Sequence, residues 1–244
     1  MRFMTKKYRL VSLFVGATAL VLVLMARLHE VKSSLTERDI MYLQKLNQEF
    51  SLSPLDENTS YEDEIDLIQK IQKATLKLTP RWEGIPFGMT REPEDVYQRA
   101  QGLCYDRSRL IEKWAKFNRF PVRHVGLYST INHPALIALI LDETNSHSIT
   151  EVRTKKGWMV VDSNDPWLSL DRNGYPISLS QIKKNTKGPT LDWHPNYVSH
   201  MNHVYEQPFT YVYGLYSRHG RFYPPYNFIP DINWKEFLLT FVCS

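Results

Sequence analysis

The sequence predicts an α+β protein, with an apolar N-terminal helix, a helical segment, and then a helix packed on an antiparallel sheet. Apolar residues recur at spacings of three and four over 40–50 and over 65–76, which is typical of helices with one buried face. Two short apolar segments, 148–153 and 158–162, flank the turn sequence Thr-Lys-Lys-Gly and indicate a β-hairpin. The region after residue 168 is rich in proline and aromatic residues, so we expect a loop-rich extension of the core.

Composition narrows the class of protein. Hydrophobic residues make up 43% and charged residues 23% of the 244 residues, which is ordinary for a folded chain. The net charge of +4 is mild, and part of it lies in the first nine residues, so nothing indicates a nucleic-acid partner. Two cysteines, Cys104 and Cys243, cannot build a disulfide framework, although they could form one bridge.

We divide the chain into five segments: a basic N-terminus (1–9), a transmembrane anchor (10–28), a helical stalk or packing helix (29–59), a core (60–168) and a C-terminal extension (169–244). The sequence contains no internal repeat and no low-complexity tract.

The N-terminal apolar run indicates a membrane anchor. Residues 10–26 carry no charge, and the run is longer than the 7–15-residue core of a cleaved signal peptide. It is slightly short of the roughly 20 residues of a full span, but its flanks can extend it. Basic residues cluster before the run, so the positive-inside rule places the N-terminus in the cytoplasm and residues 29–244 across the inner membrane.

The helices have recognisable ends. Ser34 or Thr36 could cap the helix over 40–50, and Ser60 with Asp63 forms a capping-box pattern that begins the next one. Thr79 precedes a proline that ends this second helix.

The core then continues through a short helix over 94–98 and a helix of about four turns that begins at Cys104. Residues 122–127 read as a strand. The apolar run 135–141 could be a strand or a short helix, and its length favours a strand. We expect a short helix over 179–184, loops over 189–230, and a final helix or strand over 234–242.

Cys104 has the features of a nucleophile. At the start of a helix, the positive end of the macrodipole favours a thiolate, and a nearby imidazole such as His147 would pair with it. Gly102 permits a tight turn, and the amide of Cys104 could donate to an oxyanion.

The hairpin predicts where an acid would meet this imidazole. A loop centred on Lys155 and Lys156 pairs residues whose numbers sum to 311, so Asp162 faces Ile149 and lies diagonally from His147 on the same strand face. A slip of one residue would place the two side chains on opposite faces.

These segments resemble the transglutaminase-like superfamily of papain-like cysteine enzymes. The resemblance covers roughly residues 60–168 and rests on Gly-Leu-Cys-Tyr-Asp-Arg-Ser, His-Ser-Ile-Thr-Glu-Val and Gly-Trp-Met-Val-Val-Asp-Ser, in that order. It implies that Cys104 is the nucleophile, His147 the base and Asp162 the orienting acid. The animal crosslinking enzymes carry Gln-Cys-Trp, whereas Leu103 and Tyr105 flank this cysteine, so a glutamine oxyanion donor and calcium dependence are not implied.

Several other residues stay open as alternatives or as structural residues. Asn164 and Asp165 compete with Asp162 for the acid, and His124 and His133 could line a cleft. We interpret the remaining polar or aromatic residues of interest as structural, core, solvated or surface residues: Asp106 and Arg107 (structural), Trp158 (core), Glu151 (solvated), and His194, His200 and His203 (surface, without zinc).

The residues therefore predict a membrane-anchored thiol enzyme that cleaves or transfers an amide or peptide bond through a thioester. Its expected partners are the membrane and a peptide or protein substrate of the cell envelope, without a metal or organic cofactor. The alternative is a catalytically inactive binding or scaffold module of an envelope or surface-polysaccharide assembly, which would use the aromatic C-terminal region. Neither the substrate nor the choice between water and an amine follows from the sequence.

Overall fold

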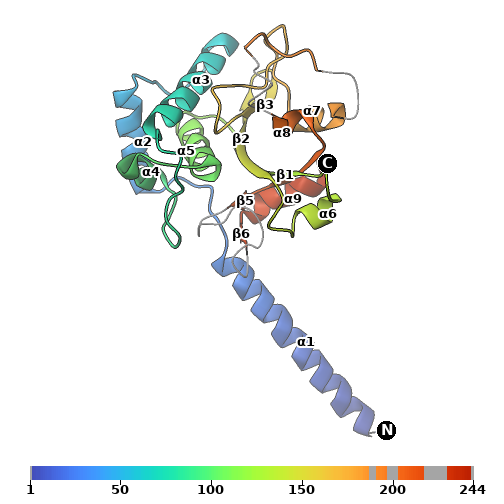
Figure 1. The fold of residues 1–244 in the computed structure, drawn as a ribbon. Helices are drawn as coiled ribbons and strands as arrows, with labels where there is room; N and C mark the ends of the chain where they lie inside the picture. Colours follow the sequence, from blue (N-terminus) through green and yellow to red (C-terminus); the bar gives the residue numbers. More distant parts are fainter. Residues whose placement is uncertain (1, 187–190, 197–202, 217–229, 243–244) are drawn as a thin grey trace.

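The computed structural model describes residues 2–186, 191–196, 203–216 and 230–242 (Figure 1). The helices are α1 (Arg2–Leu28), α2 (Glu37–Glu49), α3 (Tyr61–Leu78), α4 (Pro93–Arg99), α5 (Cys104–Phe117), α6 (Ala135–Ala138), α7 (Leu179–Asn185), α8 (His203–Glu206) and α9 (Trp234–Val242). The strands are β1 (Val122–Ser129), β2 (Ser146–Thr154), β3 (Gly157–Val161), β4 (Phe209–Tyr213), β5 (Leu215–Tyr216) and β6 (Asp231–Ile232). The predicted α+β class is confirmed.

Helix α1 projects from the rest of the protein as a single long rod (Figure 1). Its window Val11–Leu28 has a mean hydropathy of 2.2, and none of that window is buried. Among the described residues this helix alone is long and apolar enough to cross a membrane. Leu13, Phe14 and Leu22 are more than 60% exposed, so α1 has no apolar partner within the described chain.

The next helices form a layer on one side of the molecule, with α2, α3 and α4 gathered around α5 (Figure 1). The predicted capping box of Ser60 with Asp63 is confirmed at the start of α3, and at the start of α2 the cap Thr36 forms a second capping box with Asp39. Thr36, rather than Ser34, is therefore the cap of α2. Trp114 of α5 is fully buried in this layer.

The main sheet is antiparallel, with the strand order β3-β2-β1-β4. Thr150 pairs with Val161 and Val152 pairs with Met159, so the predicted register, in which residue numbers sum to 311, is confirmed. Strand β4 lies inside 189–230, where we expected only loops. Its aromatic residues Phe209, Tyr211 and Tyr213 alternate with smaller ones and join one apolar cluster, while Val212 on the other face is buried in a second cluster.

The preference for a strand over 135–141 is wrong, because this run forms the short helix α6. Pro134 lies at its N-cap, and the amides of Ala138 and Leu139 donate to the carbonyls of Pro134 and Ala135. Both sides of β1 are already occupied by β2 and β4, so the run has no place beside the strand that precedes it.

The two faces of the sheet have different coverings. Ser148 and Thr150 point to the face covered by α5, where their hydroxyls contact the Ser108 side chain and carbonyl. Ile149 points to the other face and joins an apolar cluster with Leu179 of α7 and several aromatic residues. Because side chains alternate along β2, His147 belongs to this second face.

Candidate active site

Cys104 is the first residue of α5, as predicted. It is a free cysteine and partly exposed. The backbone before it is held by Asp106, whose Oδ2 accepts hydrogen bonds from the amides of Leu103 at 2.9 Å and Ile85 at 3.2 Å. Gly102 suits this close approach, because a Cβ at this position would lie 3.1 Å from the Cβ of Asp106, a tighter contact than most side chains make. The carboxylate of Asp106 thus fixes the start of the helix that carries the thiol.

His147 and Asp162 contact each other directly. Nε2 of His147 lies 3.0 Å from Oδ2 of Asp162, and the carboxylate is almost completely buried. The other carboxylate oxygen accepts the backbone amides of Asn164 at 2.7 Å and Asp165 at 3.0 Å. Asn164 and Asp165 were the sequence alternatives to Asp162 as the orienting acid. In the structure, their backbone amides donate hydrogen bonds to Asp162 instead.

The contact shifts the pKa values of both groups. Burial disfavours the charged imidazolium of His147, but the charge and hydrogen bond of Asp162 outweigh it, with a further contribution from Cys104, and raise the pKa of His147 to about 10. Burial likewise opposes ionisation of Asp162, yet the His147 charge and its hydrogen bonds hold the pKa of this carboxyl below its usual value. The pair is therefore an imidazolium and a carboxylate at neutral pH.

The thiol of Cys104 reaches the same imidazole. A side-chain hydrogen bond between Cys104 and His147 is among the interactions that raise the pKa of His147. Because Nε2 faces Asp162, Nδ1 is the ring nitrogen that remains for the thiol. The structure thus brings together the three residues singled out in the sequence, in the order thiol, imidazole, carboxylate.

Two residues that hold the acid could not be found from the sequence. The hydroxyl of Tyr205 in α8 donates to Oδ2 of Asp162 at 2.6 Å. The side-chain amide of Gln72 in α3 donates to the carbonyl oxygens of Asp162 at 2.8 Å, Asp165 at 2.9 Å and Trp167 at 2.6 Å. Both partners are far along the chain, so no local pattern marks them.

Arg107 lies one helical turn after Cys104 and is also buried. Its guanidinium donates to the side chain and carbonyl of Thr79 and to the side chain of Asn164, and it stacks 4.1 Å from the ring of Trp82. Burial lowers the pKa of Arg107, while nearby acidic groups, among them Asp106 and Asp162, oppose that shift. The expected structural role fits these contacts, and the guanidinium also adds positive charge beside the thiol.

Two sequence interpretations are wrong. Glu151, expected to be solvated, is fully buried. Its carboxylate accepts hydrogen bonds from Arg123 at 2.7 Å and from the hydroxyl of Tyr213 at 3.0 Å. Trp158, expected in the core, is only partly buried and lies under the guanidinium of Arg123 at 4.1 Å. Strand β4, which was not predicted, brings Tyr213 to this carboxylate and so changes the surroundings of both residues.

The structure gives His124 and His194 partners other than Cys104 and Asp162. His124 does not line a cleft but is buried under α5, where Nε2 lies 3.1 Å from the Ser148 hydroxyl. Nδ1 of His194 accepts a hydrogen bond from the amide of Asn196. His200 and the side chain of His203 lie outside the described residues. Among the described part of the chain, no group of histidine, cysteine, aspartate and glutamate residues could hold a metal ion.

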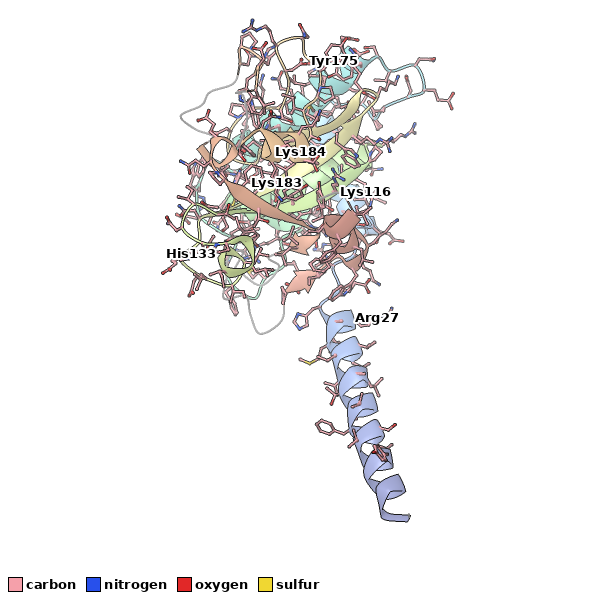
Figure 2. All side chains as sticks on the ribbon, turned by 90° about the vertical axis from the view of Figure 1, so that its right-hand side faces the viewer. Arg27, Lys116, His133, Tyr175, Lys183 and Lys184 are labelled. Atoms are coloured by element: carbon pink, nitrogen blue, oxygen red, sulfur yellow. The ribbon has the colours of Figure 1, made fainter. Side chains whose placement is uncertain are left out.

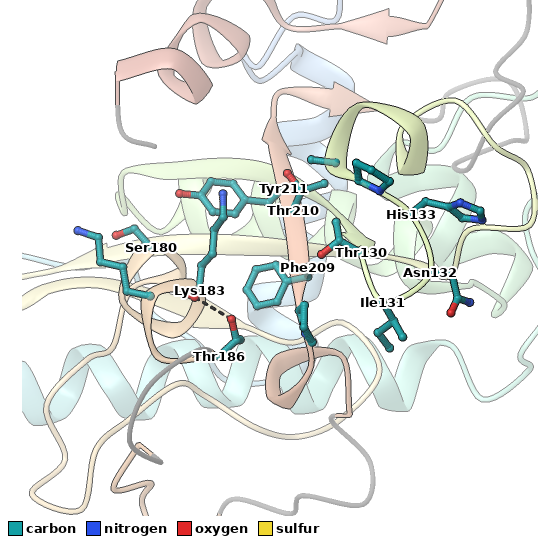
Figure 3. Close-up of a pocket in the computed structure, with 14 residues that line it drawn as sticks. Thr130, Ile131, Asn132, His133, Ser180, Lys183, Thr186, Phe209, Thr210 and Tyr211 are labelled. Carbon is teal, nitrogen blue, oxygen red and sulfur yellow. Dashed lines mark hydrogen bonds between the residues drawn. The ribbon is translucent and has the colours of Figure 1, made fainter.

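Figure 3 shows a cavity of the structure, with a volume of about 640 Å³. The strand register places its residue Tyr211 on the same sheet face as His147. Among the described residues, the lining includes two lysines and one histidine and no acidic residue: Thr130, Ile131, Asn132, His133, Pro134, Ala135, Ser180, Lys183, Lys184, Thr186, Pro208, Phe209, Thr210 and Tyr211. His147 pairs with Leu127, and Leu127 pairs with Tyr211, so the cavity begins two strands from His147, or about 10 Å away. Figure 2 shows Lys183 and Lys184 on the side of the molecule that carries this cavity.

The comparisons with known proteins add little to this geometry. No protein-family model matches the chain, and no curated protein matches it. One solved structure, described as a "putative cysteine protease" from Cytophaga hutchinsonii, aligns at 15% identity with a TM-score of 0.32. The alignment covers 61% of this chain and 48% of the other, so the chain spans about half the length of that protein. At this TM-score we base no conclusion on the similarity.

Proposed function

We propose that the chain is a membrane-anchored thiol enzyme of the transglutaminase-like type, which cleaves or transfers an amide bond. Cys104 is the nucleophile, His147 the base and acid, and Asp162 the orienting carboxylate. The observation that carries the proposal is the 3.0 Å contact between His147 and Asp162, together with the side-chain hydrogen bond between Cys104 and the same imidazole. This arrangement has the parts of an activated nucleophile.

The reaction follows from these positions. The thiolate of Cys104 attacks the amide carbonyl, and the carbonyl oxygen becomes an oxyanion that the amide of Cys104, at the positive end of the α5 dipole, can stabilise. The imidazolium of His147 then gives its proton to the departing nitrogen as the carbon–nitrogen bond breaks, leaving a thioester on Cys104. Water or an amine next attacks the thioester and loses a proton to His147, and the thiolate leaves. The imidazolium–thiolate pair is restored.

The location of the substrate is also part of the proposal. We place α1 across the cytoplasmic membrane, with the N-terminus in the cytoplasm and the core on the outer side, which gives the enzyme access to peptide chains of the cell envelope. The cavity of Lys183 and Lys184 lies on the face of His147 and carries no acidic side chain, which favours a substrate with an acidic group. In the double variant Lys183→Gln/Lys184→Gln, kcat/KM should fall for acidic substrates while neutral ones are unaffected; equal losses for both would contradict this placement.

The first test is the alkylation of Cys104 as a function of pH, in a Cys243→Ser background. An ordinary thiol with a pKa of about 8.5 is less than about 1% ionised at pH 6, whereas a thiolate paired with imidazolium reacts there at nearly its full rate. We expect a fast plateau below pH 7 that is lost in His147→Ala and kept in His133→Ala, a matched change of a more exposed histidine. A slow rate that rises only above pH 8, unaffected by His147→Ala, would favour the inactive scaffold instead.

A further inference from the structure

Helices α6 and α9 expose a set of large apolar side chains on the surface of the core. We call this set the apolar face: Leu136 (77% exposed), Ile137 (44%), Ile140 (67%), Leu238 (61%), Phe241 (72%) and Val242 (81%). The two helices belong together, because Ala138 of α6 and Trp234 and Phe237 of α9 pack in one apolar cluster. Contiguous exposed apolar surface of this kind marks a site of contact with a protein or a membrane.

The end of α1 is fastened to the segment that carries the apolar face. The indole nitrogen of Trp234, the first residue of α9, donates to the carbonyl of Ala26 at 3.1 Å. Immediately after α1, the amide of Val31 donates to the carbonyl of Ile232 at 2.9 Å, and the amide of Ile232 donates to the carbonyl of His29 at 3.0 Å. No flexible spacer therefore separates α1 from α9.

This short connection limits how far the core can lie from a bilayer. The 18 residues of the window Val11–Leu28 measure about 27 Å as a helix, close to the roughly 30 Å of a hydrocarbon core. Leu28 is 82% exposed, and Val31, three residues later, is already buried in the core. If α1 spans the membrane, the core begins within about one helical turn of the membrane surface.

The figures show on which side of the core the apolar face lies. In Figure 1, α1 runs away from the core toward the side on which α6 and α9 lie, whereas α2, α3 and α4 lie on the opposite side. Figure 2 shows Arg27 at the junction between α1 and the core. Arg27 and Lys235 of α9 are both exposed cations, which suit the headgroup layer beside an apolar surface. The acidic Asp142 and Glu143 follow α6 and limit the face on that side.

We propose that the apolar face rests in the outer boundary of the bilayer that α1 spans, with phospholipid as its partner. The core is then held against the membrane at two places, α1 and the apolar face, and does not turn freely on a stalk. The cavity of Lys183 and Lys184, which residues 130–135 line in part, opens next to this contact. This inference rests on the anchor in the proposed function but not on the chemistry of Cys104.

The test uses the full chain in vesicles of phosphatidylcholine and phosphatidylglycerol. In a background with Cys104→Ser and Cys243→Ser, single cysteines at Leu136 and Phe241 carry a nitroxide label. Val21 in α1 provides the lipid reference, and Met41 of α2, which is 55% exposed, provides the water reference. Paramagnetic resonance then measures collisions of each label with oxygen, which concentrates in lipid, and with a water-soluble nickel complex.

We expect the labels at Leu136 and Phe241 to favour oxygen, as at Val21, with collisions with nickel at least about fivefold below those at Met41. Collision values like those at Met41 would overturn the proposal. Low collision with both reagents together with spin–spin broadening would also overturn it, because a second copy of the chain would then cover the face. A label at Val21 that collides with the nickel complex would show that α1 does not span the bilayer. This result would contradict the proposed membrane anchor, and it is distinct from a result that contradicts lipid contact of the apolar face alone.

Discussion

Half-buried His147 and fully buried His124, on neighbouring strands of one sheet, have pKa values that are shifted in opposite directions. His147 faces Asp162 on one side of the sheet, and its pKa is raised to about 10. His124 lies on the other side, under α5, and burial together with the positive charge of Arg109 lowers its pKa to about 3. Both rings contact an oxygen within 3.1 Å, so the difference comes from the charge of the neighbours and not from the presence of a partner.

The surroundings of His124 also contain the residue types of a catalytic triad. Ser148 lies between His124 at 3.1 Å and Ser108 at 2.7 Å, and Glu112 lies 3.7 Å from Nδ1 of His124. The hydroxyls and the ring are fully buried, however, and Glu112 is held by Arg109 at 3.1 Å. A serine, a histidine and a glutamate in contact are therefore not sufficient for catalysis: the histidine must be able to carry a proton, and the nucleophile must be accessible.

The largest effect should come from Asp162→Asn, which removes the charge that distinguishes the two histidines. Burial would then be opposed only by the smaller contribution of Cys104, so we expect the pKa of His147 to fall from about 10 toward the lowered value of His124. If the proposed function holds, turnover should decrease by about 10³–10⁴-fold, as for the loss of this carboxylate in other triads. Alkylation of Cys104 at pH 6 and the imidazole NMR signals of His147 measure both effects. An unchanged alkylation rate would remove Asp162 from the site.

Stability should depend on pH in opposite ways for the two histidines. For His147 the folded pKa of about 10 lies above the ordinary 6.5, so its contribution is complete below pH 6.5 and is lost as the pH rises toward 10. For His124 the folded pKa of about 3 lies below 6.5, so stability decreases as the pH falls from 6.5 toward 3. Each histidine contributes up to about 1.4 kcal/mol per pH unit.

Urea denaturation of His147→Gln and His124→Gln from pH 4 to 9 separates these contributions. Relative to the unsubstituted protein, the first variant should flatten the alkaline side of the stability curve and the second should flatten the acidic side. Because each variant is compared with the same parent, the other ionisable groups cancel to first order. The same change on the same side in both variants would contradict the assigned pKa shifts.

The sequence predicted local features well. The capping box of Ser60 with Asp63 spans three residues, Thr36 was one of two candidate caps of α2, and the hairpin register depends on one short loop. Because that register places His147 diagonally from Asp162, the contact between them could also be predicted. These features depend only on periodicity and on the geometry of neighbouring strands.

What the sequence did not reveal depends on distant partners. Gln72 lies 90 residues from Asp162, and Tyr205 lies 43 residues away on the other side. Glu151 is buried in part by Tyr213, which belongs to β4. Because this strand lies in an aromatic, proline-rich segment that we predicted as loops, we expected Glu151 to be solvated. A single sequence does not show such contacts, since nothing nearby in the chain depends on them.

A substitution of His124, on the α5 side of the sheet, should have an intermediate effect on the free energy of unfolding. His124→Asn should leave the Ser148 hydroxyl without its ring partner in a dry environment, so the free energy of unfolding should decrease by about 1–3 kcal/mol. Alkylation of Cys104 should stay within about twofold, since His124 does not contact the thiol. Denaturation and alkylation of one preparation provide both values. A large loss of alkylation at unchanged stability would mean that the two faces of the sheet are coupled.

The smallest effect should come from Tyr205→Phe, which removes one of two hydrogen bonds to Oδ2 of Asp162. The ionic contact with His147 remains, so we expect a decrease of about 1 kcal/mol in the free energy of unfolding and a several-fold loss of alkylation at pH 6. The rate of Cys104 alkylation as a function of pH distinguishes orientation from packing. If Tyr205 only packs, the pH at which the rate falls off on the acidic side (the low-pH limb) stays the same, and only the free energy of unfolding changes. If it orients the carboxylate, the low-pH limb moves upward, because Asp162 loses a donor that favours its ionised form. Tyr211→Phe, a change of a buried tyrosine on the same sheet face without a contact to Asp162, should leave that limb in place.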